Sequence, residues 1–537
     1  MPYVYKIHAM ADGSRSSPAS DEKPSIPAWF LWGMPSAADL VFVAVLCTLL
    51  LTPLSAKLLG DAGIGWHIRT GQQILATHSI PRVNPFSSTM DGKPWFAWEW
   101  FYDVGVGALD ALCGLNGPVW FTSIVIAAVF GWLFRLLIQR GMDLMFALFL
   151  WLLAISASTI HFLARPHVLS WLFALASFWV LDSTERQDAE TGNSRGHSRL
   201  WLLPLLMLAW VNVHGGFLLE FVLIGIFWFG ALWTWMRTGE VSLEASLRKI
   251  VWGKRVRDLT LVGVATAGTS LVNPYGWKLH EHIYHYLSNQ FLMDHIEEFQ
   301  SPNFHGLAQR CFLLLLLLSL AVLIGRGRQL SASEALVVLF AVYSGLYASR
   351  NIPVSSLFLA MTFGPLCPKL GSHEFLSRME RIESEQRGHL WPLLSVVATL
   401  AMVAHGGRIG SDQVVDADFN QNRMPVEATS FLRTEKIKGP ILSPDYWGGY
   451  LIYTLYPEIK VVVDDRHDFY GSEFLDSYLK LIHVEDGWEA LLDQTNPGCL
   501  LLPRGSALAN VLGKSAGWRS IYADKLSIVF VRDSADR

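Results

Sequence analysis

The densest group of residues that could perform chemistry begins soon after the first apolar segment. Asp61 is followed there by Trp66, His67 and Arg69. A carboxylate in such a group can take a proton from an attacking hydroxyl, or hold a divalent cation such as Mg²⁺ or Mn²⁺ that screens a phosphate. Asp61 also suits the start of the amphipathic segment 63–76, where an acid caps a helix. Both roles stay open, and they are compatible.

Four further motifs place Arg, His or Asn beside the ends of apolar segments. They are ARPH (164–167), WVNVHGG (210–216), LVNPYG (271–276) and ASRNIP (348–353). Arginine binds phosphate oxygens bidentately, and Asn and His suit sugar hydroxyls. Hydrogen bonding between helices explains any one of them equally well, but four together favour a shared cavity. The candidate substrate-binding residues are Trp66, His67, Arg69, Arg165, His167, Asn212, His214, Asn273, Tyr275, Arg350 and Asn351.

Composition indicates that a lipid bilayer must surround these groups. The chain of 537 residues is 52% hydrophobic and 16% charged, where soluble domains carry about 25% charged residues. Long uncharged runs recur from Leu40 to about Ala404. The net charge is -4 and no basic block is present, so we expect no nucleic-acid partner. The five cysteines have no CxxC spacing, and we assign no metal ligand.

Eleven segments are predicted to span the membrane as helices, each having a length and apolarity compatible with roughly 30 Å of hydrocarbon. They are 37–58, 117–138, 142–163, 166–183, 200–214, 216–237, 258–273, 311–325, 331–348, 351–368 and 390–405. We therefore predict a cytoplasmic tail at 1–36, a transmembrane domain at 37–405 and a soluble domain at 406–537.

The distribution of Lys and Arg predicts the orientation of these spans, because cytoplasmic loops carry an excess of both. The basic loops are 248–257, 325–329, the turn with Arg135 and Arg140, and the loop with Arg378, Arg381 and Arg387. If these are cytoplasmic, the loop 59–116 and all residues after 406 are external. The polar motifs then collect on the external side.

The stretch 96–114 resembles a further span but is better explained as a helix on the membrane surface. Glu99, Asp103 and Asp110 within it would be costly at the centre of a bilayer. Counting it as a span would also move the basic loops outside. Its tryptophans suit the level of the lipid headgroups.

The C-terminal region from 406 reads as a small α/β domain, because short β-branched or apolar strands alternate with helical stretches. Two motifs lie at predicted strand ends, DYWGGY (445–450) and DDRHD (464–468). Asp464 and Asp465 could bind a cation, but Arg466 beside them favours a structural ion pair.

Taken together, these segments resemble the GT-C superfamily of polytopic glycosyltransferases, which take sugars from polyprenyl-phosphate donors. The shared features are a long first external loop with an acid soon after the first span, juxtamembrane helices in that loop, and an external C-terminal domain. The most similar segments are 61–75, IPRVNPFSS (80–88) and KPWFAWEW (93–100), with the four motifs above. They look like a bacterial group of GT-C-like proteins.

The resemblance implies that Asp61 is the base or a metal-site ligand. Many members carry paired acids, whereas Asp61 is followed by Ala62, Gly63, Ile64 and Gly65. A second acid must come from elsewhere, and Glu99 and Asp103 are the candidates.

These features lead to a functional hypothesis with one alternative. We expect a glycosyltransferase of the bacterial inner membrane, with its C-terminal domain in the periplasm, that moves a sugar from a polyprenyl-phosphate lipid to an acceptor on a glycan, lipid or protein. Arg165 and Arg350 are expected to hold the phosphate. The alternative is a non-catalytic membrane protein that binds or transports lipid-linked glycans or serves as a scaffold.

Overall fold

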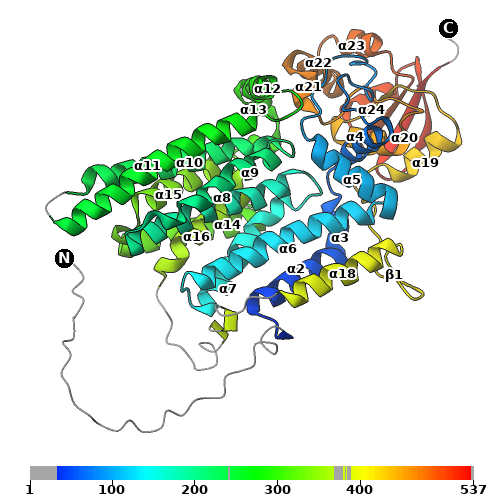
Figure 1. Ribbon diagram of the computed structural model, residues 1–537. Helices are drawn as coiled ribbons and strands as arrows, with labels where there is room; N and C mark the ends of the chain where they lie inside the picture. The colour runs from blue at the N-terminus through cyan, green and yellow to red at the C-terminus, as the bar shows by residue number, and fades with distance from the viewer. Residues whose placement is uncertain (1–32, 240–241, 368–378, 381, 384–388, 534–537) are drawn as a thin grey trace, which may run out of the picture.

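A computed structural model of the chain describes residues 33–239, 242–367, 379–380, 382–383 and 389–533. The first 32 residues of the predicted tail lie outside these ranges, as do Arg378, Arg381 and Arg387 of a predicted cytoplasmic loop. The described residues form a long helical bundle with a smaller unit that contains a sheet at one end (Figure 1).

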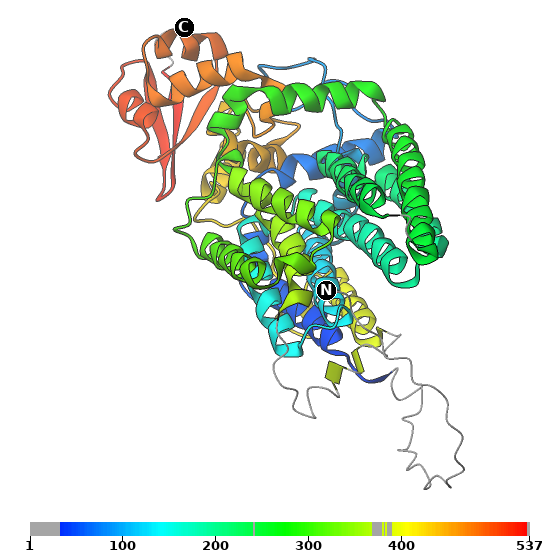
Figure 2. The ribbon, with the colours of Figure 1, turned by 90° about the vertical axis from the view of Figure 1, so that its left-hand side faces the viewer.

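The bundle is built from helices that coincide with the predicted spans, since every predicted segment overlaps at least one helix. These helices are α2 (Ala37–Leu51), α3 (Leu54–Leu58), α6 (Asn116–Gln139), α7 (Leu144–Ser158), α8 (His167–Thr191), α9 (Leu202–Trp210), α10 (Leu218–Arg237), α11 (Leu243–Ser270), α14 (Leu307–Arg326), α15 (Ala332–Tyr347), α16 (Ile352–Phe363) and α18 (Leu390–Ala404). Figure 1 shows several of them side by side, and Figure 2 views the bundle from its far end, with the C-terminal unit in orange and red at the upper left.

Within the described ranges, four stretches are both long and apolar enough to cross a membrane. They are Asn116–Gln139, Leu144–His161, Gly215–Arg237 and Leu307–Arg326. Helices α2, α15 and α18 are apolar but shorter. The class of polytopic helical membrane protein is therefore supported, and the number of eleven spans stays a prediction.

The predicted basic loop 248–257 is wrong as a loop, because α11 is already helical from Leu243. The reason is that Arg255 of this stretch turns inward and is fully buried against α8. Its guanidinium donates to Asp188 Oδ2 at 2.9 Å and to the Thr184 hydroxyl at 3.2 Å. The helix is thus fixed by polar contacts that hydropathy does not register.

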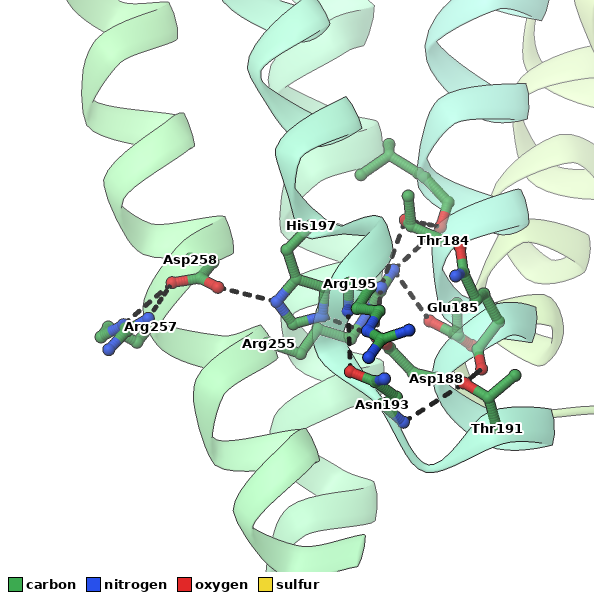
Figure 3. A network of polar contacts seen from close by, with 12 residues as sticks. Thr184, Glu185, Asp188, Thr191, Asn193, Arg195, His197, Arg255, Arg257 and Asp258 are labelled. Carbon is green, nitrogen blue, oxygen red and sulfur yellow. Dashed lines mark hydrogen bonds and ion pairs between the residues drawn. The ribbon is translucent and has the colours of Figure 1, made fainter.

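A histidine completes this group of polar contacts. His197 lies between two carboxylates, with Nε2 2.9 Å from Asp188 Oδ2 and Nδ1 2.7 Å from Asp258 Oδ2 (Figure 3). We call Thr184, Glu185, Asp188, His197, Arg255 and Asp258 the α8–α11 network. It lies toward the end of α8 that is distant from His167.

Helices α4 (Ile64–Thr77) and α5 (Trp100–Cys113) form a closely packed pair beside the end of the bundle (Figure 1). Gly71 permits this packing, because a Cβ atom there would overlap the carbonyl of Asp103. The segment 96–114 is therefore helical over most of its length. Its position at the membrane surface stays a prediction.

The C-terminal unit contains a four-stranded sheet in the order β3-β4-β6-β5. Strand β4 lies inside the sheet, because it pairs parallel with β3 and antiparallel with β6. Its sequence, CLLLP, is almost entirely apolar and buried, as is typical of an internal strand. The strands are β3 (Ile441–Leu442), β4 (Cys499–Pro503), β5 (Trp518–Ala523) and β6 (Ser527–Arg532), and β1 (Arg408–Ile409) with β2 (Asp412–Gln413) forms a separate hairpin. The helices of this unit are α19 (Val426–Thr434), α20 (Asp445–Leu455), α21 (His467–Tyr470), α22 (Ser472–His483), α23 (Trp488–Thr495) and α24 (Ala507–Leu512).

Two contacts join the C-terminal unit to the loop after the first helix. Gly65 of α4 and Gly449 of α20 touch without room for side chains, since a Cβ on Gly65 would overlap the carbonyl of Gly449. The loop before α5 also pairs with the segment that follows α20, through the Ser88 N–H to the Val461 carbonyl at 2.8 Å. Helices α12 (Trp277–Ser288) and α13 (Gln290–His295) lie beside the same unit (Figure 1).

Candidate functional site

A cavity of about 1030 Å³ lies between the helical bundle and the C-terminal unit, and we call it the main cavity. Its lining includes acids and bases from both parts of the chain. Those that bear on its chemistry are Lys57, Asp61, Arg165, Arg423, Asp445 and Asp465.

Asp61 lines the main cavity, where two contacts hold its carboxylate. Its Oδ1 accepts the backbone N–H of Gly63 at 2.7 Å, but Gly63 is the N-cap of α4, so the predicted capping by Asp61 is wrong and its role in catalysis stays a prediction. Its Oδ2 accepts a hydrogen bond from Arg165 Nη1 at 3.1 Å. Both side chains are about one quarter exposed, so the ion pair faces the cavity. The turn thus fixes the carboxylate and leaves one edge open to a substrate.

Asp465 supplies a second carboxylate beside Asp61. A Cβ atom on Gly63 would lie 2.6 Å from Asp465 Oδ2 and 2.9 Å from Asp61 Oδ1, so the two acids flank this glycine. Burial and, after it, the neighbouring charge of Asp61 raise the pKa of Asp465 to about 7, against the opposing effect of Arg165. A carboxyl group with this pKa can gain and lose a proton near neutral pH. Glu99 and Asp103, the expected sources of the second acid, lie elsewhere.

The paired acids of the DDRHD motif therefore have separate roles. Asp464 accepts two hydrogen bonds from the Arg466 guanidinium, at 2.8 and 2.7 Å, and one from Tyr470 at 2.8 Å. Arg466 also donates to Asn84 Oδ1 at 2.8 Å. This is the structural ion pair that the sequence favoured, but it involves Asp464 and leaves Asp465 free to face the cavity.

A carboxylate–imidazole pair lies on the same wall of the main cavity. His467 Nε2 is 2.7 Å from Asp445 Oδ2, and the backbone N–H of Asp445 donates to the Tyr478 hydroxyl at 2.9 Å. Burial lowers the pKa of His467, but the hydrogen bond and charge of Asp445 outweigh it, and the net pKa is raised. His467 therefore takes up a proton near Asp465 more readily than a free histidine does.

A smaller pocket of about 40 Å³ shares Arg165 with the main cavity, and we call it the side pocket. Glu99 lies there, with its carboxylate 3.7 Å from His67 Nε2 and 3.8 Å from His214 Nε2. Burial raises the pKa of Glu99 to about 8 in spite of the opposing charge of Arg165. His167 also lines this pocket. At neutral pH Glu99 is mostly protonated, which suits a hydrogen-bond donor better than a base.

Arg350 lines the side pocket but already has a carboxylate partner. Its guanidinium lies 3.5 Å from Glu298 Oε1. Burial alone would raise the pKa of Glu298, but Arg350 and Arg165 lower it to about 2. The positive charge of both arginines is thus balanced by acids of the chain itself, Glu298 and Asp61.

Asp103 lies away from both cavities. Its Oδ1 is 2.6 Å from His67 Nδ1, and neither side chain is accessible to solvent. Burial lowers the pKa of His67 and raises that of Asp103, so the pair is held without net charge. This arrangement fixes α4 against α5.

The remaining predicted residues make contacts within the fold and do not line either cavity. Their contacts explain why. Trp66 stacks on His67, and Arg69 donates to the Tyr453 carbonyl. Asn212 accepts from Trp100 Nε1, and Asn351 donates to the Ser344 carbonyl. Asn273 accepts from the Tyr275 N–H, while the Tyr275 hydroxyl accepts from the Ala97 N–H. Their role in substrate binding stays a prediction.

The main cavity offers few protein ligands for a divalent cation. Among the described residues, no group of three or more His, Cys, Asp or Glu side chains is arranged to hold a metal. Asp61 and Asp465 offer two carboxylates, the number with which Mg²⁺ is commonly held beside waters and phosphates, but Arg165 already donates to Asp61 Oδ2.

Several cavity residues had no distinctive signal in the sequence. Asp445 and Asp465 belong to the two motifs noted at strand ends, but nothing in their spacing placed them opposite Asp61. Lys57, Glu298 and Arg423 lie in no motif at all. Only the folded chain brings them together.

Comparison with known proteins identifies the fold. No protein-family model and no curated protein sequence matches the chain. The archaeal oligosaccharyltransferase AglB from Archaeoglobus fulgidus, in complex with an inhibitory peptide and a dolichol-phosphate, superposes with a TM-score of 0.52 and 10% identity, over 93% of this chain and 74% of that chain. The Archaeoglobus fulgidus oligosaccharyltransferase tethered with an acceptor peptide gives a TM-score of 0.50 and 11% identity, over 93% and 74%.

A third structure, ArnT from Cupriavidus metallidurans bound to undecaprenyl phosphate, aligns over 93% of this chain and 97% of that chain with 13% identity. Its TM-score of 0.44 is too low to assign a fold. The two oligosaccharyltransferase structures show similarity of fold alone at such low identity. They confirm that the chain has the GT-C-like fold that the sequence resemblance predicted.

Proposed function

We propose that this protein of GT-C-like fold is a membrane glycosyltransferase that moves a sugar from a polyprenyl-phosphate donor to an acceptor hydroxyl at the external face. One observation carries the proposal: Asp61, Arg165 and Asp465 meet in a cavity roofed by the C-terminal unit. The similarity in fold to an oligosaccharyltransferase solved with a dolichol-phosphate supports the choice of donor class. In this proposal 37–405 spans the inner membrane of a bacterium and 406–537 is periplasmic.

The reaction is a single displacement at the anomeric carbon of the sugar. The acceptor oxygen forms a bond to this carbon while the bond to the phosphate oxygen breaks, and the phosphate leaves with the electron pair. The proton of the acceptor hydroxyl passes to the carboxylate pair Asp61 and Asp465. The configuration at the anomeric carbon is inverted.

The carboxylate pair suits this proton transfer for two reasons. Asp61 is held by the Gly63 N–H and by Arg165, so its open edge has a fixed direction. The pKa of Asp465, raised to about 7 by burial and by Asp61, lies near the pH at which the enzyme must work. One member of the pair therefore orients the hydroxyl and the other can take up its proton.

The test replaces the carboxylate by an amide of the same shape. We expect Asp61→Asn to lower sugar transfer by roughly 10² to 10⁴ fold, the usual contribution of a positioned base. The full chain is reconstituted in liposomes with a panel of polyprenyl-phosphate hexoses that carry a tritiated sugar. Transfer to an endogenous lipid or glycan acceptor is then counted.

The matched control is Asp416→Asn, which removes an exposed acid of the C-terminal unit that lines neither cavity. It should transfer sugar at the rate of the unmodified protein. If Asp61→Asn transfers as fast as this control from the same donor, the mechanism is wrong. If the unmodified protein transfers from no member of the panel but binds these lipids, a non-catalytic lipid-linked-glycan binder replaces the proposal.

A further inference from the structure

Two cations in the main cavity, Lys57 and Arg423, have no hydrogen-bond or ion-pair partner for their side chains among the residues that the structure describes. Both side chains are exposed. This distinguishes them from Arg165 and Arg350, which are paired with Asp61 and Glu298. A phosphate that bound to these arginines would compete with carboxylates already in place. The two unpaired cations offer their charge without that competition.

The backbone holds the two cations near each other. The carbonyl of Arg423 accepts the indole N–H of Trp447 at 2.8 Å, which fixes its segment to the start of α20. A Cβ atom on Gly60 would lie 2.9 Å from the Lys57 carbonyl and 3.3 Å from Arg423 Nη1. Gly60 thus leaves the space through which the Arg423 guanidinium approaches the end of α3.

Two exposed leucines precede Lys57 in the chain. Leu51 and Leu54 lie six and three residues before it, and each is 40% exposed. Leu51 ends α2, which begins the predicted first span, and Leu54 begins α3, the helix that contains Lys57. A lipid chain lying on these leucines would bring its headgroup to Lys57. Lys57 itself lines the main cavity, so a headgroup bound there would enter the cavity while the apolar part of the lipid stays in the membrane.

We infer that Lys57 and Arg423 bind the phosphate of a polyprenyl-phosphate lipid whose chain runs past Leu54. Arginine contributes a planar fork that matches two phosphate oxygens, and lysine contributes a mobile point charge. The inference rests on the proposed function for the choice of a polyprenyl lipid. It replaces Arg165 and Arg350 as the phosphate-binding residues.

Binding of the phosphate by Lys57 and Arg423 would also set the orientation of the sugar relative to the carboxylates. Asp61 is four residues after Lys57, and with Asp465 it makes the part of the cavity that would repel a phosphate. With the phosphate at Lys57 and Arg423, the sugar extends toward the carboxylates and its anomeric carbon lies between leaving group and base. The acceptor then enters from the side of the C-terminal unit.

The experiment measures binding without requiring transfer. The full chain in nanodiscs is titrated with undecaprenyl phosphate, and bound lipid is counted by native mass spectrometry. We expect Lys57→Ala/Arg423→Ala to weaken binding by about tenfold or more, which corresponds to one charged phosphate contact. Lys57→Arg/Arg423→Lys should retain most of the affinity, because both charges remain.

The control variant Lys438→Ala/Lys514→Ala removes two exposed lysines of the C-terminal unit that line neither cavity, and it should bind like the unmodified protein. If the alanine double variant does not fold, Lys57→Gln/Arg423→Gln is used in its place. Unchanged binding in the double variant, or loss in Arg350→Ala alone, overturns the inference. So does equal displacement by phosphatidylglycerol, which would mean that any phosphate headgroup is accepted.

Failure of the inference and failure of the proposed function are separable. If undecaprenyl phosphate binds tightly and its binding depends on Lys57 and Arg423, but no donor supports sugar transfer, the inferred phosphate site is retained. The proposed glycosyltransferase function is then rejected. If sugar transfer continues after both cations are removed, the proposed glycosyltransferase function is retained. The inferred phosphate site at Lys57 and Arg423 is then rejected.

Discussion

Ionisable residues gather toward both ends of the helical bundle, and the two groups are bonded differently. In the α8–α11 network, Arg255 lies 2.9 Å from Asp188, and His197 lies within 3 Å of two carboxylates (Figure 3). In the main cavity, Lys57 and Arg423 have no partner for their side chains among the described residues. The charged side chains of the network are paired with one another, whereas the cavity leaves two cations for a ligand.

The difference shows that charge near a membrane is not by itself a sign of function. Both groups contain Arg, His and carboxylates, and sequence alone treats them alike. The network stabilises α11 against α8, which explains why a basic stretch is helical there. The main cavity contains two cations that have no partner among the residues that the structure describes. The hydrogen bonds and ion pairs of these residues, and not their amino-acid types, distinguish the network from the cavity.

The largest expected contrast comes from removing one arginine at each end. Arg255→Met should lower the free energy of unfolding by about 3 to 5 kcal/mol, since it leaves the Asp188 carboxylate buried without its cation. Arg165→Met should cost much less stability, because its ion pair is partly exposed, but should abolish most sugar transfer.

Both variants are followed by thermal unfolding in detergent and by transfer per folded molecule. Equal losses of stability in the two variants would contradict the distinction between a closed network and an open site. Retention of full transfer by Arg165→Met would place the site elsewhere.

A second prediction concerns the contact that joins the C-terminal unit to the loop of Asp61. Gly449→Val should separate α20 from α4, because even a Cβ atom would overlap the Ala62 carbonyl. We expect transfer to fall by at least about tenfold and the α8–α11 network to be unaffected. Hydrogen exchange of α4 and α11 measures this, and faster exchange in α11 would show that the two ends are coupled.

The third prediction is a titration of Asp465. Because only the protonated carboxyl reacts with a hydrophobic carbodiimide, labelling of Asp465 should fall as the pH rises through about 7. The groups that face it are Asp61, Arg165, Asp464 and His467. Asp61→Asn removes a neighbouring negative charge and should move the midpoint to lower pH. A midpoint that stays in place, read by peptide mass spectrometry, would show that the two acids are not coupled.

The last prediction concerns Glu99→Gln, whose effect appears as a change in how stability depends on pH. Burial raises the pKa of Glu99 from 4.5 to about 8, so between these values the folded protein holds a proton that the unfolded chain has lost. By linkage, this glutamate makes the protein less stable as the pH rises from 4.5 to about 8. The variant should lose less stability over this range than the unmodified protein. If the free energy of unfolding depends on pH in the same way in both proteins, Glu99 is ionised in the folded state.

The sequence predicted the class of fold and some of the residues that line the main cavity, and particular residues explain the limit. Asp61 and Arg165 were found because each lies in a motif at a helix end, where local spacing has meaning. Asp465 and Arg423 were not placed, since contacts across more than 250 positions bring them to the cavity. Arg69 and Asn212 were assigned to substrate, but backbone carbonyls and an indole use their polar atoms. Hydropathy could not reveal which polar atoms are already used.

The contact between Gly65 and Gly449 has a consequence for biosynthesis. Membrane insertion proceeds from the N-terminus, so Asp61 and Arg165 reach their places hundreds of residues before Asp465 is made. The acidic pair forms only when α20 docks on α4 through these two glycines. Arg423, the proposed partner of Lys57 in phosphate binding, is also made late, so a nascent chain would hold neither the complete phosphate site nor the acidic pair. Under the proposed function, both would form together when the C-terminal unit is complete.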